Sequence, residues 1–175
     1  MYPWLRVSTS LAALCLFACT LASAAEPRCS EETLAHAEAL CAARGERLTP
    51  IRRRVLEVLS ASHKPLGAYE IMELISPKAS PPAPITVYRA LDFLRGNGLV
   101  HRIESRNAFL ACVHHHNADS VVAFLICERC GSVGEVPAAA LSHSLAAAAR
   151  AAGFAPRMSV IEIAGTCSHC RKAAE

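Results

Sequence analysis

The sequence predicts an α+β protein, in which an N-terminal winged helix-turn-helix precedes a small α/β domain. Two observations support this class: short helical segments followed by a strand hairpin fill the first part, and two Cys-x-x-Cys pairs lie in the second. The 175 residues, 53% of them hydrophobic, suffice for one domain or two small ones and argue against disorder. A net charge of +3 is too small to indicate a nucleic-acid partner by itself.

The first 26 residues resemble a secretion signal. Arg6 precedes an apolar run over 11–22, and Ala22-Ser23-Ala24 has the pattern of a signal cleavage site. The run is too short to predict a membrane span. It indicates either an exported protein or a misassigned translation start. We favour the second, because paired Cys-x-x-Cys motifs are typical of zinc sites in cytosolic proteins. We therefore expect residues 1–26 to be an extension outside the fold of a cytoplasmic protein with no stable membrane partner.

Residues 27–110 are predicted to form the winged helix-turn-helix. A helix over 31–44 has apolar residues at helical spacing and is followed by Gly45, which suits a C-cap. The next helix begins with Thr49 as N-cap and Pro50 at the first helical position. Its apolar stripe comprises Ile51, Val55, Val58 and Leu59.

Two more helices and a hairpin complete this domain. The helices are expected over Ala68–Ile75 and Thr86–Arg95. Strands over 99–104 and 107–112 then flank a turn at Ser105-Arg106. In a winged helix-turn-helix the last helix enters the major groove of DNA and the wing lies along the backbone.

The last helix carries the residues that point most directly to DNA. Tyr88 and Arg89 are expected in its first turn, where an arginine can reach guanine O6 and N7 bidentately. The alternative is a surface arginine beside a core tyrosine. The order of the elements and the basic run 52–54 favour double-stranded DNA as the partner. The candidate DNA contacts are Tyr69, Tyr88, Arg89, Arg52 and Thr86.

Residues 111–175 are predicted to form the small α/β domain. Apolar strands are expected over 121–126 and 133–136, followed by a helix that begins at Pro137 and a last strand over 157–164. This half is small for a core of its own.

The two Cys-x-x-Cys pairs predict a tetrahedral zinc site. A two-residue gap lets both sulfurs of a pair bind one ion at about 2.3 Å, and two pairs supply four ligands. The alternative is two disulfides in an exported protein. Cys112 and the histidines at 114–116 are left over, and they suggest a second metal site with mixed S, N and O ligands. The ligands of the first site are Cys127, Cys130, Cys167 and Cys170.

Three motifs form a specific combination. They are Arg47-Leu48-Thr49-Pro50-Ile51-Arg52, Thr86-Val87-Tyr88-Arg89-Ala90-Leu91 and Cys127-Glu128-Arg129-Cys130-Gly131. Together they resemble the ferric-uptake-regulator superfamily, and most closely its zinc uptake regulator branch. The resemblance covers about residues 30–171. It implies that the second half is an α/β dimerisation domain, that its four cysteines hold a structural zinc, and that a metal-loaded homodimer binds a palindromic operator.

The resemblance also implies a regulatory metal site. His101, Cys112 and Glu135 match three of the ligand positions of the family. A thiolate with imidazole and carboxylate suits zinc, whereas iron and manganese sensors favour N and O ligands. We therefore expect two zinc ions per subunit, one structural and one regulatory.

The fourth ligand of the regulatory site departs from the family pattern. Ser120 stands where the zinc branch has a histidine. If the preceding strand continues past Cys112, residues 114 and 116 share its face with the thiol. We therefore favour His116, with His114 second. The other candidates are His115 and Asp119.

These features predict a zinc-responsive transcriptional repressor of zinc-uptake genes, with no enzymatic activity and no small-molecule substrate. One alternative is an iron or other metal sensor of the same superfamily. Another is an exported metal-binding protein, which only the N-terminal segment favours. The enzyme alternative is a zinc hydrolase that uses His101, Cys112 and Glu135 with an open position for water. No His-Glu-x-x-His motif accompanies those residues.

Overall fold

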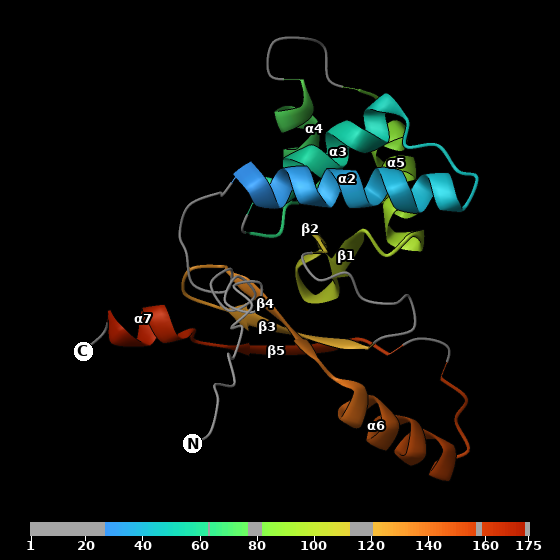
Figure 1. The fold of residues 1–175 in the computed structure, drawn as a ribbon. Helices are drawn as coiled ribbons and strands as arrows, with labels where there is room; N and C mark the ends of the chain where they lie inside the picture. The colour runs from blue at the N-terminus through green and yellow to red at the C-terminus, as the bar shows by residue number, and fades with distance from the viewer. Residues whose placement is uncertain (1–26, 63, 77–81, 113–120, 157–158, 174–175) are drawn as a thin grey trace, which may run out of the picture.

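The computed structural model consists of a helical lobe, a two-stranded wing and a sheet lobe (Figure 1). It describes residues 27–62, 64–76, 82–112, 121–156 and 159–173, with side chains from residue 30 onward. Helices, a wing and a mixed sheet in this order confirm the predicted α+β class. Within the described residues, no helix is both long and apolar enough to cross a membrane.

Four helices form the helical lobe. They are α2 (Pro27–Ala43), α3 (Pro50–Ser60), α4 (Ala68–Ile75) and α5 (Pro84–Gly96). α2 begins about one turn earlier than predicted, but it ends as expected at a glycine cap. Gly45 has a φ of 66°, its N–H donates to the Ala42 carbonyl at 3.1 Å, and the Glu46 N–H donates to the Cys41 carbonyl at 2.8 Å. This pair of bonds is the Schellman motif, which satisfies the last carbonyls of the helix.

Prolines set the starts of α3 and α5. Pro50 and Pro84 occupy the first helical turn, where a missing N–H leaves no bond unmade. The capping role predicted for Thr49 is only partly right. Its carbonyl accepts the Arg53 N–H at 2.9 Å, but its side chain makes no capping hydrogen bond within the described chain.

One buried cluster runs through the helical lobe and into the wing. Leu56, Ile71 and Leu91, from three different helices, are 0% exposed at its centre. A polar contact ties the end of α2 to the end of α5, where Arg44 Nη1 donates to Asn97 Oδ1 at 2.8 Å. The helical lobe and the inner side of the wing therefore share one apolar core.

The wing is an antiparallel hairpin of β1 (Val100–Ile103) and β2 (Ala108–Ala111). Both strands are shorter than predicted, because η2 (Glu104–Arg106) forms a 3-10 turn between them. Asn107 follows with a φ of 47°, a left-handed conformation that asparagine adopts more readily than most residues. The wing tip is therefore a compact turn.

The sheet lobe has three strands in the order β4-β3-β5, with β3 antiparallel to β4 and parallel to β5. The prediction that Pro137 starts the helix is wrong. It ends β4 opposite Val122, at the end of the ladder, where a residue without an N–H is tolerated. The last strand begins at Ile161 rather than at residue 157, and residues 157–158 lie outside the described chain. The elements are β3 (Val122–Cys127), β4 (Val133–Pro137), α6 (Ala139–Ala151), β5 (Ile161–Gly165) and α7 (Ser168–Lys172).

The apolar side chains of the sheet lobe are divided between a small core and an exposed set. Val122, Phe124 and Ile126 bury Ile103 of the wing in a second core, which is smaller than the first. In the described chain no residue of α6 is buried, and Figure 1 shows this helix extending away from the helical lobe. The exposed apolar residues of the lobe include Leu125, Leu141, Leu145 and Ile163.

Candidate metal centres and DNA-binding face

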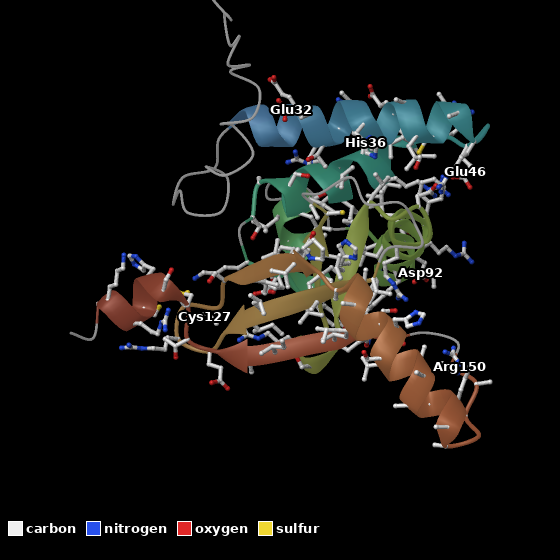
Figure 2. The ribbon with its side chains drawn as sticks, turned by 60° about the horizontal axis from the view of Figure 1, so that its bottom comes forward. Glu32, His36, Glu46, Asp92, Cys127 and Arg150 are labelled. Atoms are coloured by element: carbon white, nitrogen blue, oxygen red, sulfur yellow. The ribbon has the colours of Figure 1, made fainter. Side chains whose placement is uncertain are left out.

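Four cysteine thiols meet at one end of the sheet, where Figure 2 shows Cys127 beside α7. Cys127 ends β3, Cys130 lies in the following turn, and Cys167 and Cys170 lie at the start of α7. Their sulfur atoms are all within 4.8 Å of one another, and the Cys130 and Cys167 sulfurs are 3.8 Å apart. Four sulfurs bound to one zinc at about 2.3 Å would lie about 3.8 Å apart in a regular tetrahedron. The geometry therefore fits a single zinc ion.

Backbone hydrogen bonds shape both Cys-x-x-Cys turns. In the first, the Cys127 N–H donates to the Ser132 carbonyl at 2.9 Å and the Gly131 N–H donates to the Cys127 carbonyl at 3.0 Å. Gly131 has a φ of 77°, which a residue with a side chain adopts only at a cost. In the second, the Cys170 N–H reaches the Cys167 sulfur at 3.4 Å. Each turn thereby places both of its sulfurs in the cluster.

The cluster does not hold four thiolates equally well. Backbone N–H groups of Cys130 and Cys167 lower the pKa of Cys127 to about 5. Desolvation and the neighbouring sulfurs raise the pKa of Cys170 to about 12. Because adjacent negative sulfurs repel one another, a cation is required to keep all four as thiolates. The six cysteines whose side chains the structure describes are all free, which does not support the disulfide alternative.

A second group of ligands joins the wing to the sheet. His101 comes from β1, Cys112 follows β2, and Glu135 lies on β4. One ligand atom of each lies within 4.8 Å of the others, and His101 Nε2 is 3.8 Å from Glu135 Oε1. The His101 ring also packs on Phe124, with centroids 5.3 Å apart. The Cys112 N–H donates to the Leu99 carbonyl at 3.0 Å, which fixes the thiol beside the wing.

Burial favours a cation at this second group. The side chain of Glu135 is 3% exposed and that of His101 is 22% exposed. Burial raises the pKa of Glu135 to about 7, because a carboxylate charge is costly away from water. A cation between this carboxylate, the imidazole and the Cys112 thiol would stabilise the charged form. The donor set fits zinc, which binds all three ligand types.

The predicted fourth ligand falls on residues 113–120, which lie outside the described chain. The choice of His116, with His114 second, therefore stays a prediction. The same holds for the remaining candidates, His115 and Asp119.

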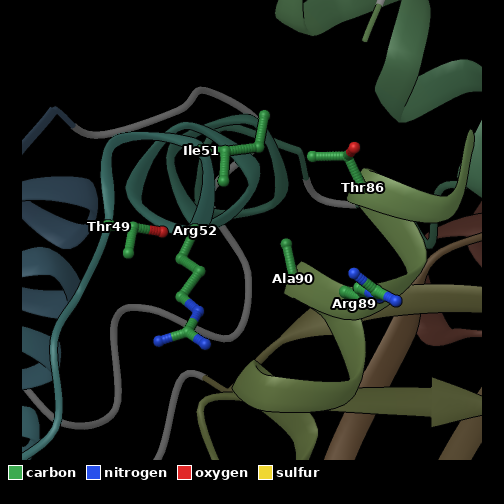
Figure 3. A pocket seen from close by; sticks show the side chains of 6 residues that line it. All are labelled: Thr49, Ile51, Arg52, Thr86, Arg89 and Ala90. Carbon is green, nitrogen blue, oxygen red and sulfur yellow. The ribbon is translucent and has the colours of Figure 1, made fainter. Parts of the chain in front are cut away.

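α5 presents Arg89 and Tyr88 at the surface. Because the helix begins at Pro84, both residues lie in its second turn, and the predicted first-turn position is wrong. Tyr88 is 39% exposed, so the alternative of a core tyrosine is also wrong, and Tyr69 on α4 is 68% exposed. A cleft between α3 and α5 brings several of the predicted contacts together (Figure 3). It is lined by Thr49, Ile51, Arg52, Thr86, Arg89 and Ala90.

The basic run of α3 also serves the fold. The Arg52 guanidinium carbon lies 3.4 Å from the centroid of the Phe93 ring, and its Nη1 donates to the Arg47 carbonyl at 2.6 Å. Such a cation–π contact stabilises the packing of α3 on α5. Arg53 is paired with Glu57 at 3.1 Å. A phosphate contact by Arg52 stays a prediction.

Two contacts that the sequence reasoning missed attach the wing tip to the sheet lobe. Glu162 on β5 accepts the backbone N–H groups of Glu104 at 2.6 Å and of Ser105 at 3.2 Å. Arg106 Nη2 donates to the Cys127 carbonyl at 3.2 Å. Both contacts use main-chain partners, which nearly every residue type supplies, so no residue pattern indicates these bonds.

Residues 43–164 match the model of the Ferric uptake regulator family. The chain belongs to this family. The zinc uptake regulation protein of Escherichia coli (strain K12) is 40% identical over 148 residues, which cover 83% of this chain and 85% of that protein. The peroxide operon regulator of Bacillus subtilis (strain 168) is 31% identical over 133 residues, which cover 73% of this chain and 86% of that protein. The family resemblance of the three sequence motifs is thereby confirmed.

Solved structures of other members of the ferric uptake regulator family resemble both lobes of this chain. A structure described as a zinc uptake regulator complexed with zinc and DNA has a TM-score of 0.77 at 39% identity. The matched region covers 83% of this chain and 97% of the solved chain. The crystal structure of holo XcZur has a TM-score of 0.71 at 43% identity, covering 79% of this chain and 96% of that one.

Proposed function

We propose that this chain is a zinc-responsive transcriptional repressor, which binds operator DNA as a zinc-loaded homodimer and represses zinc-uptake genes. It acts in the cytoplasm and as a regulator rather than an enzyme. Similarity to the zinc uptake regulation protein of Escherichia coli and to the zinc- and DNA-bound regulator supports this proposal. The observation that carries it is the group of His101, Cys112 and Glu135, which joins the wing to the sheet.

The regulatory group holds two parts of the molecule in one arrangement. His101 and Cys112 belong to the wing and Glu135 to the sheet lobe, so the three ligands meet only when wing and sheet are closed on each other. Zinc bound there supplies the link, and it favours the closed arrangement by its difference in affinity for the closed and open forms. In the closed arrangement the two α5 helices of a dimer are set at the spacing of two half-sites.

Cys112 is the residue that selects the class of metal. A thiolate among the ligands suits zinc, whereas an iron or manganese sensor favours N and O ligands. Because the Bacillus subtilis peroxide operon regulator is also a relative, family membership alone does not choose the metal. The buried thiol beside His101 and Glu135 favours zinc over the iron-sensor alternative.

The cysteine cage holds the second, structural zinc. Cys127 and Cys167 lie 40 residues apart in sequence, and the cage joins the β3–β4 turn to α7 across this separation. Zinc binding by four ligands would compensate for the small apolar core of the sheet lobe, because the free energy of metal binding contributes directly to folding. They are Cys127, Cys130, Cys167 and Cys170.

The sheet lobe supplies the dimer interface. Leu141 and Leu145 on α6 are 51% and 49% exposed in the single chain, and Ile163 on β5 is 49% exposed. Large apolar side chains left exposed on one lobe are typical of a protein interface when they are contiguous. A twofold dimer would bury them and present two identical recognition helices to a palindromic operator.

Arg89 is the residue that reads bases. It is exposed on the second turn of α5, and the adjoining cleft holds Thr86 and Arg52. An arginine in this position can donate two hydrogen bonds to guanine. Tyr69 and Tyr88 are exposed, and their side chains would suit contacts to the phosphate backbone.

A gel-shift titration tests the proposal. The operator is selected from random DNA with the zinc-loaded protein, and its binding by the full chain is measured against free zinc, iron(II) or manganese(II) held by a chelating buffer. We expect zinc to induce binding at the lowest free concentration, with two zinc ions per subunit. Binding that requires iron and ignores zinc would select the iron-sensor alternative. An exported metal carrier would show no sequence-specific binding with any of the metals.

A further inference from the structure

Three side chains on one row of the sheet face the wing. Phe124 on β3 lies opposite Glu135 on β4 and opposite Glu162 on β5. Residues aligned on neighbouring strands point to the same face of a sheet. His101 contacts two of them, because its Nε2 is 3.8 Å from Glu135 Oε1 and its ring is 5.3 Å from the Phe124 ring. Glu162, at the other end of the row, contacts the wing turn η2 instead. The row therefore contacts two different parts of the wing, strand β1 and the η2 turn.

The contact at Glu162 includes a pair of hydrogen bonds from the main chain, and the Ser105 side chain also hydrogen-bonds to its carboxylate. Its carboxylate oxygens accept the N–H groups of Glu104 at 2.6 Å and Ser105 at 3.2 Å. These groups open the η2 turn, where the first N–H groups have no partner within the turn. Hydrogen bonds to an ionised acceptor are stronger than neutral ones. Although desolvation raises its pKa, the bonds from Ser105 and Glu104 lower the pKa of Glu162 overall.

Neighbouring contacts secure the same end of the wing. Arg106 Nη2 donates to the Cys127 carbonyl at 3.2 Å. A Cβ at Gly131 would lie 3.5 Å from Arg106 Nη1, so the guanidinium lies close against the first cysteine turn. Ile103, just before the wing turn, is 0% exposed and packs in the core of the sheet lobe. The wing tip is thus attached to the sheet lobe by contacts that use no metal.

We propose that Glu162 is a positioning residue for the wing, and that its contact with the wing turn sets the zinc concentration at which operator DNA is bound. This inference rests on the proposed function. The contact forms only in the closed arrangement, in which the wing lies on the sheet. A contact made only in that arrangement raises its population, so a ligand that binds it fills its site at a lower concentration. At one end of the row Glu135 contributes to the metal site, and at the other end Glu162 holds the wing turn without metal.

Two pairs of variants isolate this contact. Glu162→Gln keeps the size of the side chain but loses its charge and one acceptor. Its control, Glu32→Gln, makes the same change on α2, away from the sheet (Figure 2). Glu104→Pro removes the donor N–H from the other side of the contact, at the first position of a helical turn, where proline is tolerated. Its control, Glu104→Ala, loses the same side chain, including the contact with Arg102, and keeps the N–H.

Amide hydrogen exchange of the wing turn is the first readout, measured on the full chain at saturating zinc. We expect the Ser105 amide to exchange slowly in the wild type and in both control variants, and faster in Glu162→Gln. The second readout is the free-zinc midpoint of operator binding. It should rise roughly three- to thirtyfold in Glu162→Gln and in Glu104→Pro. The double variant should shift it no further than the larger single change, because both changes remove one contact.

The outcomes separate the inference from the function on which it rests. If the wild type binds operator in a zinc-dependent way and both test variants keep its midpoint, the inference is wrong. If operator binding by the wild type ignores zinc, the proposed function fails, and exchange at Ser105 still tests the contact. Zinc content and dimer mass check that each variant is folded. Should Glu162→Gln fail that check, the comparison of Glu104→Pro with Glu104→Ala decides, because it leaves β5 unchanged.

Discussion

The helical lobe and the sheet lobe are stabilised in different ways. The helical lobe surrounds a continuous buried cluster, with Leu56, Ile71 and Leu91 at 0% exposure. The core of the sheet lobe has four buried residues, and one of them, Ile103, belongs to the wing. Within the described chain, α6 adds no buried residue to it. The half that carries the recognition helix therefore has the larger apolar core, and we expect the sheet half to depend on metal and on a second subunit.

This difference suits a protein whose activity follows a metal. Elements that respond to a ligand belong to the less stable parts of a structure. Only there do two conformations differ by so few kcal/mol that ligand binding can change which one is populated. The regulatory group lies at the junction of the two lobes, with His101 on the wing and Glu135 on the sheet. On the proposed function, metal binding at this junction would couple the helical lobe, which carries the recognition helix, to the sheet lobe.

The largest expected effect tests the dependence of the sheet lobe on its cage. Cys127→Ser or Cys167→Ser removes one ligand of a site that contributes about 10–16 kcal/mol of apparent binding free energy at neutral pH. Because a small domain is stable by only about 5–15 kcal/mol, the sheet lobe should unfold and the dimer dissociate, while the helical lobe stays folded. Circular dichroism and sedimentation measure both changes. Cys41→Ala, at a buried thiol outside the cage, is the control, and a stable dimer of either serine variant would contradict the prediction.

One substitution made in both lobes compares their cores directly. Leu91 is 0% exposed, so Leu91→Ala should lower the free energy of unfolding of the helical lobe by about 2–5 kcal/mol. Leu141 is 51% exposed in the single chain. Leu141→Ala should therefore leave the unfolding of the single subunit nearly unchanged and weaken the dimer by about 1–2 kcal/mol. Urea titration and sedimentation equilibrium measure the two effects. Equal destabilisation of the single subunit by both changes would show that α6 is buried without a partner.

The junction between the lobes is tested by Cys112→Ser. We expect a folded dimer that keeps its cage zinc but loses zinc-dependent operator binding, since a hydroxyl is a far poorer zinc ligand than a thiolate. Even partners that only orient a ligand are worth about 10–100-fold in metal affinity, so the free-zinc midpoint should rise by more than about 100-fold. Gel shifts in buffered zinc, with metal content per subunit, measure this. A wild-type midpoint in the variant would place the sensing site elsewhere.

The smallest expected effects concern the reading surface of the helical lobe. Arg89→Ala should cost about 1–3 kcal/mol on the operator and relax the base preference at one position per half-site. Arg52→Ala should weaken binding to all sequences alike and reduce the salt slope by about 0.9 for one phosphate. It should also lower the stability of the lobe by about 0.5–1 kcal/mol, because its guanidinium stacks on Phe93. Anisotropy titrations on operator and random DNA at several salt concentrations separate the two residues. Equal losses on both DNAs for Arg89→Ala would show that it does not read bases.

Local patterns predicted the elements of the helical lobe well. The helix Ala68–Ile75 has the predicted bounds, and Gly45 ends α2 as expected, because apolar spacing and caps act within a few residues. The errors lie where two elements meet. Pro137 suits both the end of a strand and the start of a helix, and its pairing with Val122 across the sheet decided between them. Tyr88 and Arg89 were placed one turn too early for a related reason, since the residues before Thr86 could belong to a connector or to the helix.

By itself, the sequence determined the family and the order of the elements, and it predicted ligands for both candidate metal centres, because motif spacing and residue chemistry are local properties. Only the tertiary structure decided which side chains share the wing-facing row of the sheet. Glu135 and Glu162 lie on different edge strands, and both align with Phe124 only because β3 pairs with both. Two of the partners of Glu162 are main-chain N–H groups 57 and 58 residues away. Every residue except proline offers such a group, so nothing in the sequence distinguishes these two from the rest.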